Sequence, residues 1–188
     1  MTWNPVHSNC SETRKIKYHV VPYTRGTGVD LGCGPERIWP GSLGIDRAMA
    51  PGGAGLVMDI SELSIFSDES LDYLFSSHAL SCFPANHILG ILAEWWRVVK
   101  VGGYLVLYLP HKGHYPKVGQ PGCHPDYRCD LDETEILDLM RVISDTSGSG
   151  VVVEVNEVRS DADEYSFLQV FRKTRHAHTA APHAITSH

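Results

Sequence analysis

The stretch Gly28-Val29-Asp30-Leu31-Gly32-Cys33-Gly34 is typical of a short buried strand that ends in an acid and runs into a tight glycine turn. The two outer glycines of the turn let the backbone bend sharply and let a ligand approach the chain closely. A dinucleotide site would want a third small residue at position 37, where Arg37 stands. Only 11 residues, two of them prolines, separate Leu31 from Leu43, which leaves room for about one turn of helix. The turn therefore favours a ligand without a pyrophosphate.

Apolar runs and amphipathic stretches alternate along the rest of the chain. The runs predict six further strands, namely Leu43–Asp46, Leu56–Asp59, Leu71–Phe75, Tyr104–Leu109, Val151–Val158 and Tyr165–Arg172. Helical spacing of apolar residues predicts helices over 12–19, 86–100 and 132–144. Asn86 is the expected N-cap of the middle helix, and Gly102-Gly103 is its expected stop.

The last two predicted strands are joined by a short acidic turn of about six residues. A parallel crossover needs about a dozen residues or more, so these two strands must pair antiparallel. Strands that alternate with helices imply a mostly parallel sheet covered on both faces. We therefore expect an α/β, Rossmann-like, doubly wound sheet that is mostly parallel, with one antiparallel strand near its C-terminal end.

The length and composition indicate one globular domain. The chain has 188 residues, of which 43% are hydrophobic and 20% charged. We expect an N-terminal segment or lid over 1–25, the main domain over 26–174 and a disordered polar tail over 175–188. The formal charge of −6 and the absence of a polybasic tract argue against a nucleic-acid partner.

The sequence also bears on the compartment. The longest apolar run is far shorter than the roughly 18 residues that span a bilayer, and no secretory signal is visible. The five cysteines are odd in number and lack a framework spacing, which indicates reduced thiols. We expect a cytoplasmic protein without a membrane span.

Three predicted strands end in an acid, at Asp30, Asp46 and Asp59. Ligands of open α/β sheets bind at the carboxyl ends of the strands, so these acids would share one edge. Asp30 would face an ammonium group, Asp46 would accept from two ribose hydroxyls, and Asp59 would take an adenine amino group. S-adenosylmethionine carries all three groups. Each aspartate could instead start a turn or cap a helix, and this alternative stays open.

Four segments resemble the motifs of class I S-adenosylmethionine-dependent methyltransferases: Val29–Gly34, Gly44–Asp46, Asp68–His78 and Glu94–Gly103. The resemblance extends over about residues 18–173. It implies a seven-stranded sheet with a reversed last strand, and S-adenosylmethionine as the cofactor. The cofactor-binding residues that it implies are Asp30, Gly32, Cys33, Gly34, Asp46, Arg47, Asp59, Ile60 and Ser76.

A narrower resemblance concerns the loop after the fifth strand. Leu109-Pro110-His111, Tyr115-Pro116, Gly119–Gly122 and Pro125-Asp126 are similar to bacterial methyltransferases associated with surface-polysaccharide synthesis. This resemblance implies O-methylation of a sugar hydroxyl, on a glycan or a carrier-linked sugar, by a monomer or homodimer.

One departure from the family weighs against catalysis. Many relatives read His-x-Leu-Glu-His after the fourth strand, where this chain reads His78-Ala79-Leu80-Ser81-Cys82. The acid and the second histidine are both missing. The alternative is a catalytically degenerate protein of this fold that binds or regulates.

A hydroxyl acceptor must lose a proton, which calls for a base at the carboxyl edge. The candidates are His78, His111, His114 and Asp126, with His111 preferred because Pro110 fixes the chain as it leaves the strand. A structural histidine that bonds the loop backbone is the alternative for His111. The histidines and cysteines of this loop have looser spacing than a structural zinc site, so we expect no metal.

Overall fold

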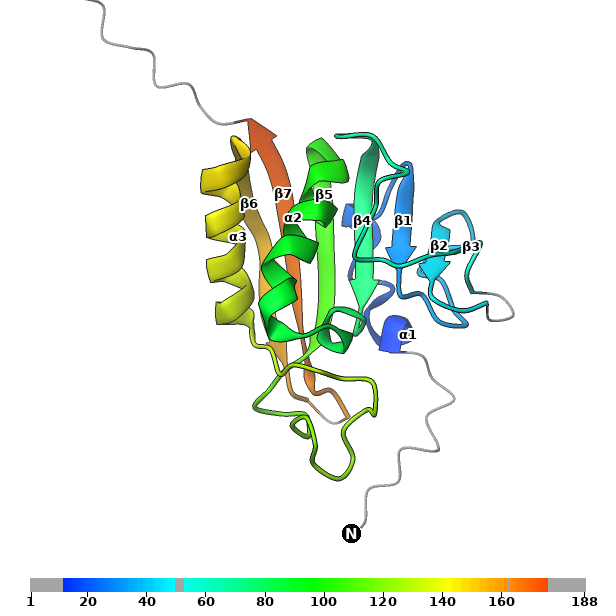
Figure 1. Ribbon diagram of the computed structural model, residues 1–188, viewed down its shortest axis with the longest axis vertical. Coiled ribbons are helices and arrows are strands. Elements are labelled where there is room, and N and C mark those ends of the chain that lie inside the picture. Colours follow the sequence, from blue (N-terminus) through cyan, green and yellow to red (C-terminus); the bar gives the residue numbers. More distant parts are fainter. Residues whose placement is uncertain (1–11, 50–52, 162, 176–188) are drawn as a thin grey trace, which may run out of the picture.

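The fold is described by a computed structural model over residues 12–49, 53–161 and 163–175. Seven strands form one sheet in the order β3-β2-β1-β4-β5-β7-β6 (Figure 1). Their bounds are β1 Gly28–Leu31, β2 Leu43–Asp46, β3 Leu56–Val57, β4 Leu71–Ser77, β5 Val99–Pro110, β6 Ser149–Arg159 and β7 Ser166–Arg175. Strands β1 to β5 pair in parallel, whereas β7 is antiparallel to both β5 and β6. The mostly parallel sheet with a reversed strand is therefore confirmed.

Two helices cover one face of the sheet. Helix α3 (Glu133–Ser147) lies in front of β6, and helix α2 (Ile88–Val98) lies in front of β7 and β5 in Figure 1. Trp95 and Trp96 of α2 are adjacent in sequence, yet both are fully buried. The Trp95 indole donates to the Ile60 carbonyl and the Trp96 indole to the Ser149 hydroxyl, so each polar edge is satisfied inside the core.

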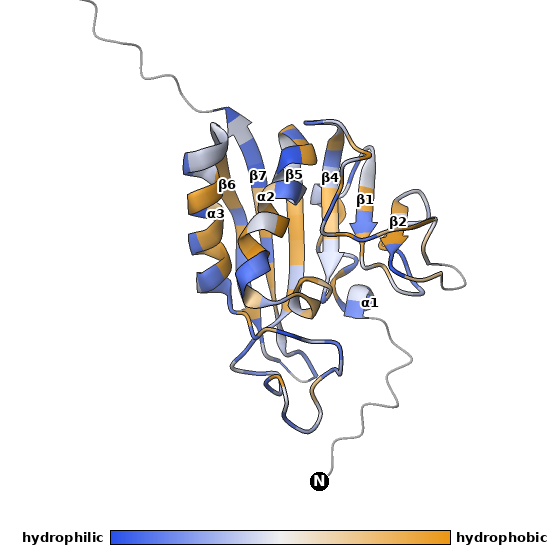
Figure 2. Cartoon of the chain, in the orientation of Figure 1, coloured by the Kyte–Doolittle hydropathy of each residue, from blue (hydrophilic) through white to orange (hydrophobic). Residues whose placement is uncertain are grey.

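The opposite face is covered without long helices. Helix α1 (Glu12–Ile16), the 3₁₀ turn η2 (Val21–Tyr23) and the loop between β1 and β2 supply this layer. Ile16, Val20 and Ile38 are fully buried there and form one apolar cluster with side chains of β4, β5 and β7. Figure 2 shows apolar residues along the central strands, and polar residues dominate the loop that follows β5.

The ends of α2 differ from the prediction. A 3₁₀ turn, η4 (Ala85–His87), precedes the helix, so Asn86 is not its N-cap, and no side chain caps this end. The helix ends at Val98 rather than at the glycines, because β5 begins at once with Val99 in extended conformation. The buried Lys173 ammonium of β7 donates to the carbonyls of Trp96 and Val99 at 3.0 Å each, so a distant strand stabilises this end of the helix.

The bounds of β3 and α3 also differ from the prediction. β3 has only two residues, because Asp59 accepts the Ser61 amide at 2.8 Å and so closes a turn where the strand was expected to continue. Helix α3 begins with a capping box between Asp132 and Glu135 and continues three residues past Ser144 to a left-handed Gly148. Of the expected divisions, residues 1–11 of the lid and 176–188 of the tail lie outside the described ranges. No helix within those ranges has the length and apolar character to cross a membrane.

The close approach of β1 to β4 gives the first prediction. A Cβ on Gly28 would lie 2.3 Å from ring atoms of the buried Tyr73, so Gly28→Ala should destabilise the fold by about 1–3 kcal/mol. Gly90 is exposed on α2 with open space around it, so Gly90→Ala should stabilise by up to about 1 kcal/mol. Urea unfolding of both variants checks this, and a Gly28→Ala variant as stable as the parent contradicts the packing.

Candidate cofactor and acceptor site

The predicted site residues gather at one edge of the sheet. β1, β2, β4 and β5 are parallel, so their carboxyl ends meet at this edge, and the loop 111–132 extends from it (Figure 1). Asp30, Asp46, His78 and His111 each lie at or directly after one of these strand ends. The topology therefore brings together residues that are up to 81 positions apart in sequence.

The glycine turn after β1 has the geometry that a close ligand requires. Gly32 and Gly34 have φ values of 69° and 55°, in the left-handed region that favours glycine. A Cβ on Gly32 would lie 2.2 Å from the methyl of Ala79, so this glycine packs directly on the segment after β4. A Cβ on Gly34 would meet no atom within 4 Å. Gly34 thus leaves open space where a ligand can approach the backbone.

Asp30 is a buried carboxylate with one oxygen unpaired. Its Oδ2 accepts the Ile38 amide at 2.6 Å, which fixes the loop between β1 and β2. Its Oδ1 is buried and has no hydrogen-bond partner among the described residues. Burial is the main reason that the pKa of Asp30 is raised to about 7, although the Ile38 amide acts in the opposite direction. A ligand ammonium would satisfy this oxygen.

The other two acids are engaged differently. Asp46 accepts the Gly34 amide through Oδ2 at 2.8 Å, so it shapes the glycine turn from the end of β2. Asp59 accepts both the amide and the hydroxyl of Ser61 through Oδ1, which is the turn geometry that the sequence left open. The side chain of its neighbour Ile60 is largely buried, with 8% of its surface exposed.

Two further residues of the predicted cofactor set are Ser76, near the end of β4, and Cys33, in the glycine turn after β1. The Ser76 hydroxyl donates to the Leu31 carbonyl at 3.0 Å and ties β4 to β1. Cys33 is buried, and burial raises the pKa of its thiol to about 12, so the thiol stays protonated. The Ser76 side chain therefore holds the two strand ends together.

Arg47 and Asp126 are joined by an ion pair. Arg47 directly follows β2, and Asp126 lies in the loop after β5. The hydrogen bond to Asp126 raises the pKa of the Arg47 guanidinium above its ordinary value. The structure therefore brings Arg47, which was predicted to bind the cofactor, into contact with Asp126, which was predicted as a candidate base.

His78 follows β4 in a left-handed backbone conformation, which few non-glycine residues adopt. Its φ is 59°, and non-glycine residues in the left-handed region occur mostly where the surrounding structure enforces them. Its Nδ1 lies 3.0 Å from the Tyr127 hydroxyl and its Nε2 lies 2.9 Å from the Ser166 hydroxyl. Burial lowers the pKa of His78 to about 3, so the ring is neutral at physiological pH.

Helix α1 contributes a carboxylate that sequence reasoning missed. The Tyr165 hydroxyl donates to Glu12 Oε1 at 2.6 Å, and Glu12 Oε2 lies 3.9 Å from His78 Nε2. This second oxygen is buried and accepts no hydrogen bond, while the Lys15 ammonium is 3.2 Å away. No motif marks Glu12, because only the fold brings α1 to the tip of β4.

His111 has a carboxylate partner that was also missed. Its Nδ1 accepts the Gly113 amide at 3.0 Å, so the ring proton is on Nε2, which lies 3.0 Å from Glu133 Oε2. Glu133 is the first residue of α3. A carboxylate that orients an imidazole is the arrangement of a general base, and the Gly113 contact also fits the structural alternative.

The cysteines and histidines of the loop after β5 do not gather around one point. His111 pairs with Glu133, and Cys129 is buried beside the Ser81 carbonyl. Within the described ranges, no group of three or more His, Cys, Asp or Glu side chains has an arrangement that could hold a metal ion.

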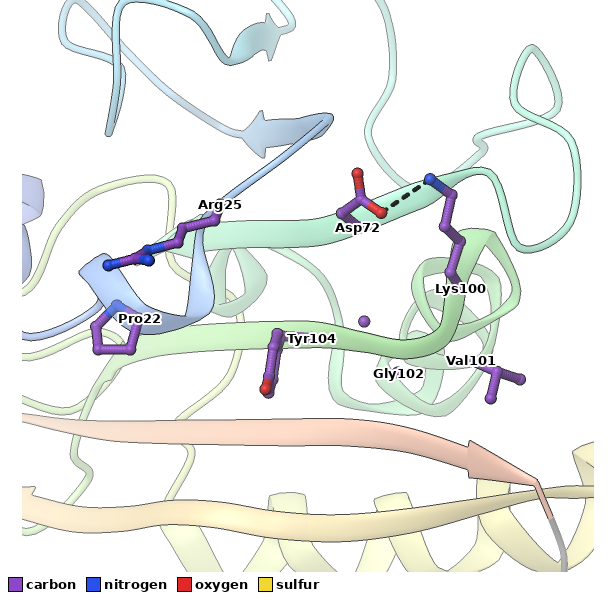
Figure 3. A pocket seen from close by; sticks show the side chains of 8 residues that line it. Pro22, Arg25, Asp72, Lys100, Val101, Gly102 and Tyr104 are labelled. Atoms are coloured by element: carbon purple, nitrogen blue, oxygen red, sulfur yellow. Dashed lines mark hydrogen bonds and ion pairs between the residues drawn. The ribbon is translucent and has the colours of Figure 1, made fainter.

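A separate pocket lies at the opposite edge of the sheet. It has a volume of about 320 Å³, and Figure 3 shows Arg25, the Lys100–Asp72 ion pair and Tyr104 around it. Its lining comes from the amino ends of β4 and β5 and from the segment around η2. This pocket therefore includes none of the predicted site residues.

Comparison with known proteins agrees with this geometry. Residues 38–107 match the family of methyltransferase domains. No curated protein matches the sequence, whereas 417 chains of solved structures do. An S-adenosylmethionine-dependent methyltransferase from Archaeoglobus fulgidus is 14% identical, with a TM-score of 0.63 over 86% of this chain and 94% of that one.

Two other structures extend this likeness. A chain from the Haloferax volcanii complex between a methyltransferase activator and a methyltransferase is 19% identical, with a TM-score of 0.63 over 88% of this chain and 90% of that one. A Burkholderia thailandensis N1-methyltransferase holds S-adenosylhomocysteine and 1,6-didemethyltoxoflavin. It is 15% identical, with a TM-score of 0.60 over 86% of this chain and 76% of that one. These likenesses establish the fold, and the family match adds a methyltransferase domain.

The raised pKa of Asp30 predicts a specific pH dependence of stability. A carboxyl whose pKa is higher in the folded state stabilises the fold below its unfolded pKa, and this contribution is lost as the pH rises through about 7. Asp30→Asn keeps an oxygen for the Ile38 amide but cannot ionise. The variant should match the parent near pH 3, below the unfolded value of 3.8, and exceed it at about pH 8 by up to roughly 4 kcal/mol. Urea unfolding across this range checks it, and parallel pH profiles of the two proteins would contradict it.

Proposed function

We propose that this chain, a class I S-adenosylmethionine-dependent methyltransferase by its domain match and fold, methylates a sugar hydroxyl on a glycan or carrier-linked sugar. The observation that carries the cofactor half of this proposal is the unpaired, buried Asp30 oxygen near the open space at Gly34. That pairing of a buried anion with an accessible backbone turn suits an amino-acid tail with an ammonium group.

The described residues fit S-adenosylmethionine at three points. Asp30 Oδ1 would hold the ammonium, the open backbone at Gly34 would receive the rest of the amino-acid tail, and Asp46 would accept from the ribose. Asp59 or Ile60 would contact the adenine. When bound, the cofactor supplies a methyl group on a positively charged sulfur. The chain's own task is to orient the acceptor, exclude water and remove one proton.

The acceptor half of the proposed site, which is formed by the loop after β5 and helix α1, contains aromatic and polar side chains of the kind that bind sugars. The Tyr115 ring lies 4.8 Å from the Tyr165 ring and 5.6 Å from the Tyr127 ring, between centroids. Aromatic faces pack on apolar surfaces such as the C–H face of a sugar, while hydroxyls and carboxylates bond its hydroxyls. This cluster, with Glu12 beside it, supports a neutral polyol acceptor.

His111 is the proposed base. A base is most effective when its pKa lies near the working pH, and the pKa of His78, at about 3, is far too low. His111 presents its unprotonated Nδ1, and Glu133 can hold the proton on Nε2. In the reaction, the acceptor proton would pass to Nδ1 once the Gly113 amide gives way. His78 and Asp126 then serve to position the loop.

A binding protein without catalysis is the second candidate. Both ring nitrogens of His78 and of His111 already have partners, and the uncharged Ser81 and Cys82 stand where relatives have an acid and a histidine. Such a protein would bind the cofactor and transfer no methyl group. Turnover with any acceptor separates the two candidates.

Substitution of the base tests the catalytic proposal. Methyl transfer from labelled S-adenosylmethionine to a panel of glycans should fall by about 10²–10⁴-fold in His111→Ala, because general base catalysis is lost. The affinity for S-adenosylhomocysteine, measured by calorimetry, should stay unchanged. His114→Ala is the comparison, because its exposed ring lies 4.7 Å from His111 but has no carboxylate partner among the described residues, so its turnover should stay near that of the parent. Full activity of His111→Ala would remove it from the role.

A pair of glycine variants tests the cofactor site. Gly34→Ala places a methyl in the open space and also strains a left-handed residue, so the affinity for S-adenosylhomocysteine should weaken at least about tenfold. Gly119→Ala introduces the same kind of strain, at φ 83° and also with open space, in the loop after β5. Its affinity should be unchanged. Equal losses in both variants would show an effect of strain alone.

A further inference from the structure

The Arg47–Asp126 ion pair joins segments that follow two non-adjacent strands of the sheet. Arg47 follows β2, Asp126 lies in the loop after β5, and β1 and β4 lie between these two strands in the sheet order. Neighbouring strands are about 4.8 Å apart, so the strands that the pair connects are about 14 Å apart. The loop that carries Asp126 must therefore reach across the carboxyl ends of β4 and β1, where His78 and the glycine turn lie, to meet Arg47.

The loop that carries Asp126 is firmly held next to it. The Tyr127 hydroxyl bonds His78, and the Arg128 amide donates to the Ser81 carbonyl at 2.8 Å. Tyr127 itself is largely buried, with 7% of its surface exposed. Asp126 thus extends from a fixed point on the acceptor half toward the cofactor half.

The ion pair itself is exposed to solvent. The side chains of Arg47 and Asp126 are 71% and 35% exposed. Exposed pairs of this kind contribute little to folding stability and exchange readily with water. Stability therefore does not account for the pair.

The open space beside Gly34, called the cofactor groove below, adjoins residues of the proposed cofactor site and the ion pair. Arg47 directly follows Asp46, which accepts the Gly34 amide at 2.8 Å, and Gly34 is the glycine with open space beside it. Cys82, partly buried after β4, is acted on electrostatically by Arg47, Asp126 and Asp46. Its thiol therefore lies close to the pair, on the β4 side of the same groove.

We propose that Arg47 and Asp126 form a clasp over the cofactor groove, which must open for the cofactor or its product to enter or leave. Asp126 is then a positioning residue that holds Arg47 over the groove, rather than a proton acceptor. The clasp rests on the proposed function in one respect, namely that the groove binds S-adenosylmethionine. It also links the two halves of the site, because the loop that contributes the acceptor tyrosines closes the cofactor side.

Release of S-adenosylhomocysteine, measured by stopped-flow competition, tests the clasp without an acceptor. Arg47→Ala and Asp126→Asn should each raise the dissociation rate by roughly two- to fivefold, as expected for loss of one exposed ion pair. The exchanged double variant, Arg47→Asp with Asp126→Arg, should return the rate to that of the parent. The matched control is the exposed Arg141–Asp138 pair on α3, where Asp138→Asn should leave the rate unchanged.

Salt gives a second, variant-free measurement. Raising the salt from about 0.1 M to about 1 M shortens the Debye length from roughly 10 Å to 3 Å. The dissociation rate of the parent should increase, while the rates of the single variants should change little.

Each outcome decides the proposal. Unchanged rates in both single variants overturn the clasp and leave the methyltransferase proposal intact. Faster release that the exchanged pair does not reverse also overturns it and shows that Arg47 contacts the ligand directly. If the folded parent binds neither S-adenosylmethionine nor S-adenosylhomocysteine, the proposed function fails and the clasp with it.

Discussion

The buried carboxylate of Asp30 is the interaction on which the carboxyl edge depends. One oxygen accepts the Ile38 amide and holds the segment between β1 and β2 as a loop, with Ile38 packed in the second apolar cluster. The other oxygen has no partner among the described residues. Burial disfavours ionisation, so a cationic ligand that pairs with this oxygen gains from the same desolvation that disfavours the free carboxylate. Asp30 thus shapes the loop with one oxygen and leaves a second buried oxygen that a cationic ligand would pair with.

The edge has two halves that meet over β1 and β4. In the proposed site, Gly32, Gly34 and Asp46 would form the cofactor half, and the segment after β4, the loop after β5 and helix α1 would form the acceptor half. They touch where Gly32 packs on Ala79 and where Arg47 pairs with Asp126. Because no long helix follows β1, the short loops and α1 must close the site, which explains why α1 supplies Glu12 at the tip of β4.

Sequence patterns were sufficient for the fold and for part of the site. Apolar runs ending in acids predicted β1 and β2, and the short connection after β6 predicted the antiparallel hairpin, because these signals are local. The predicted end of α2 was wrong. The Lys173 ammonium, which donates to the carbonyls of Trp96 and Val99 there, lies 75 residues after Val98 and could not be inferred from local sequence. Glu12 and Glu133 were missed for the same reason: each meets its histidine only through the tertiary fold.

Proton linkage of ligand binding tests the central claim most directly. At about pH 6, Asp30 is largely protonated, and pairing with the ammonium of S-adenosylhomocysteine should ionise it. Calorimetric titrations in buffers of different ionisation enthalpy should therefore show release of up to about one proton by the parent. Asp30→Asn should bind more weakly and release none through this residue. Binding with no difference in proton release between the two proteins, or no binding by the folded parent, would contradict the account.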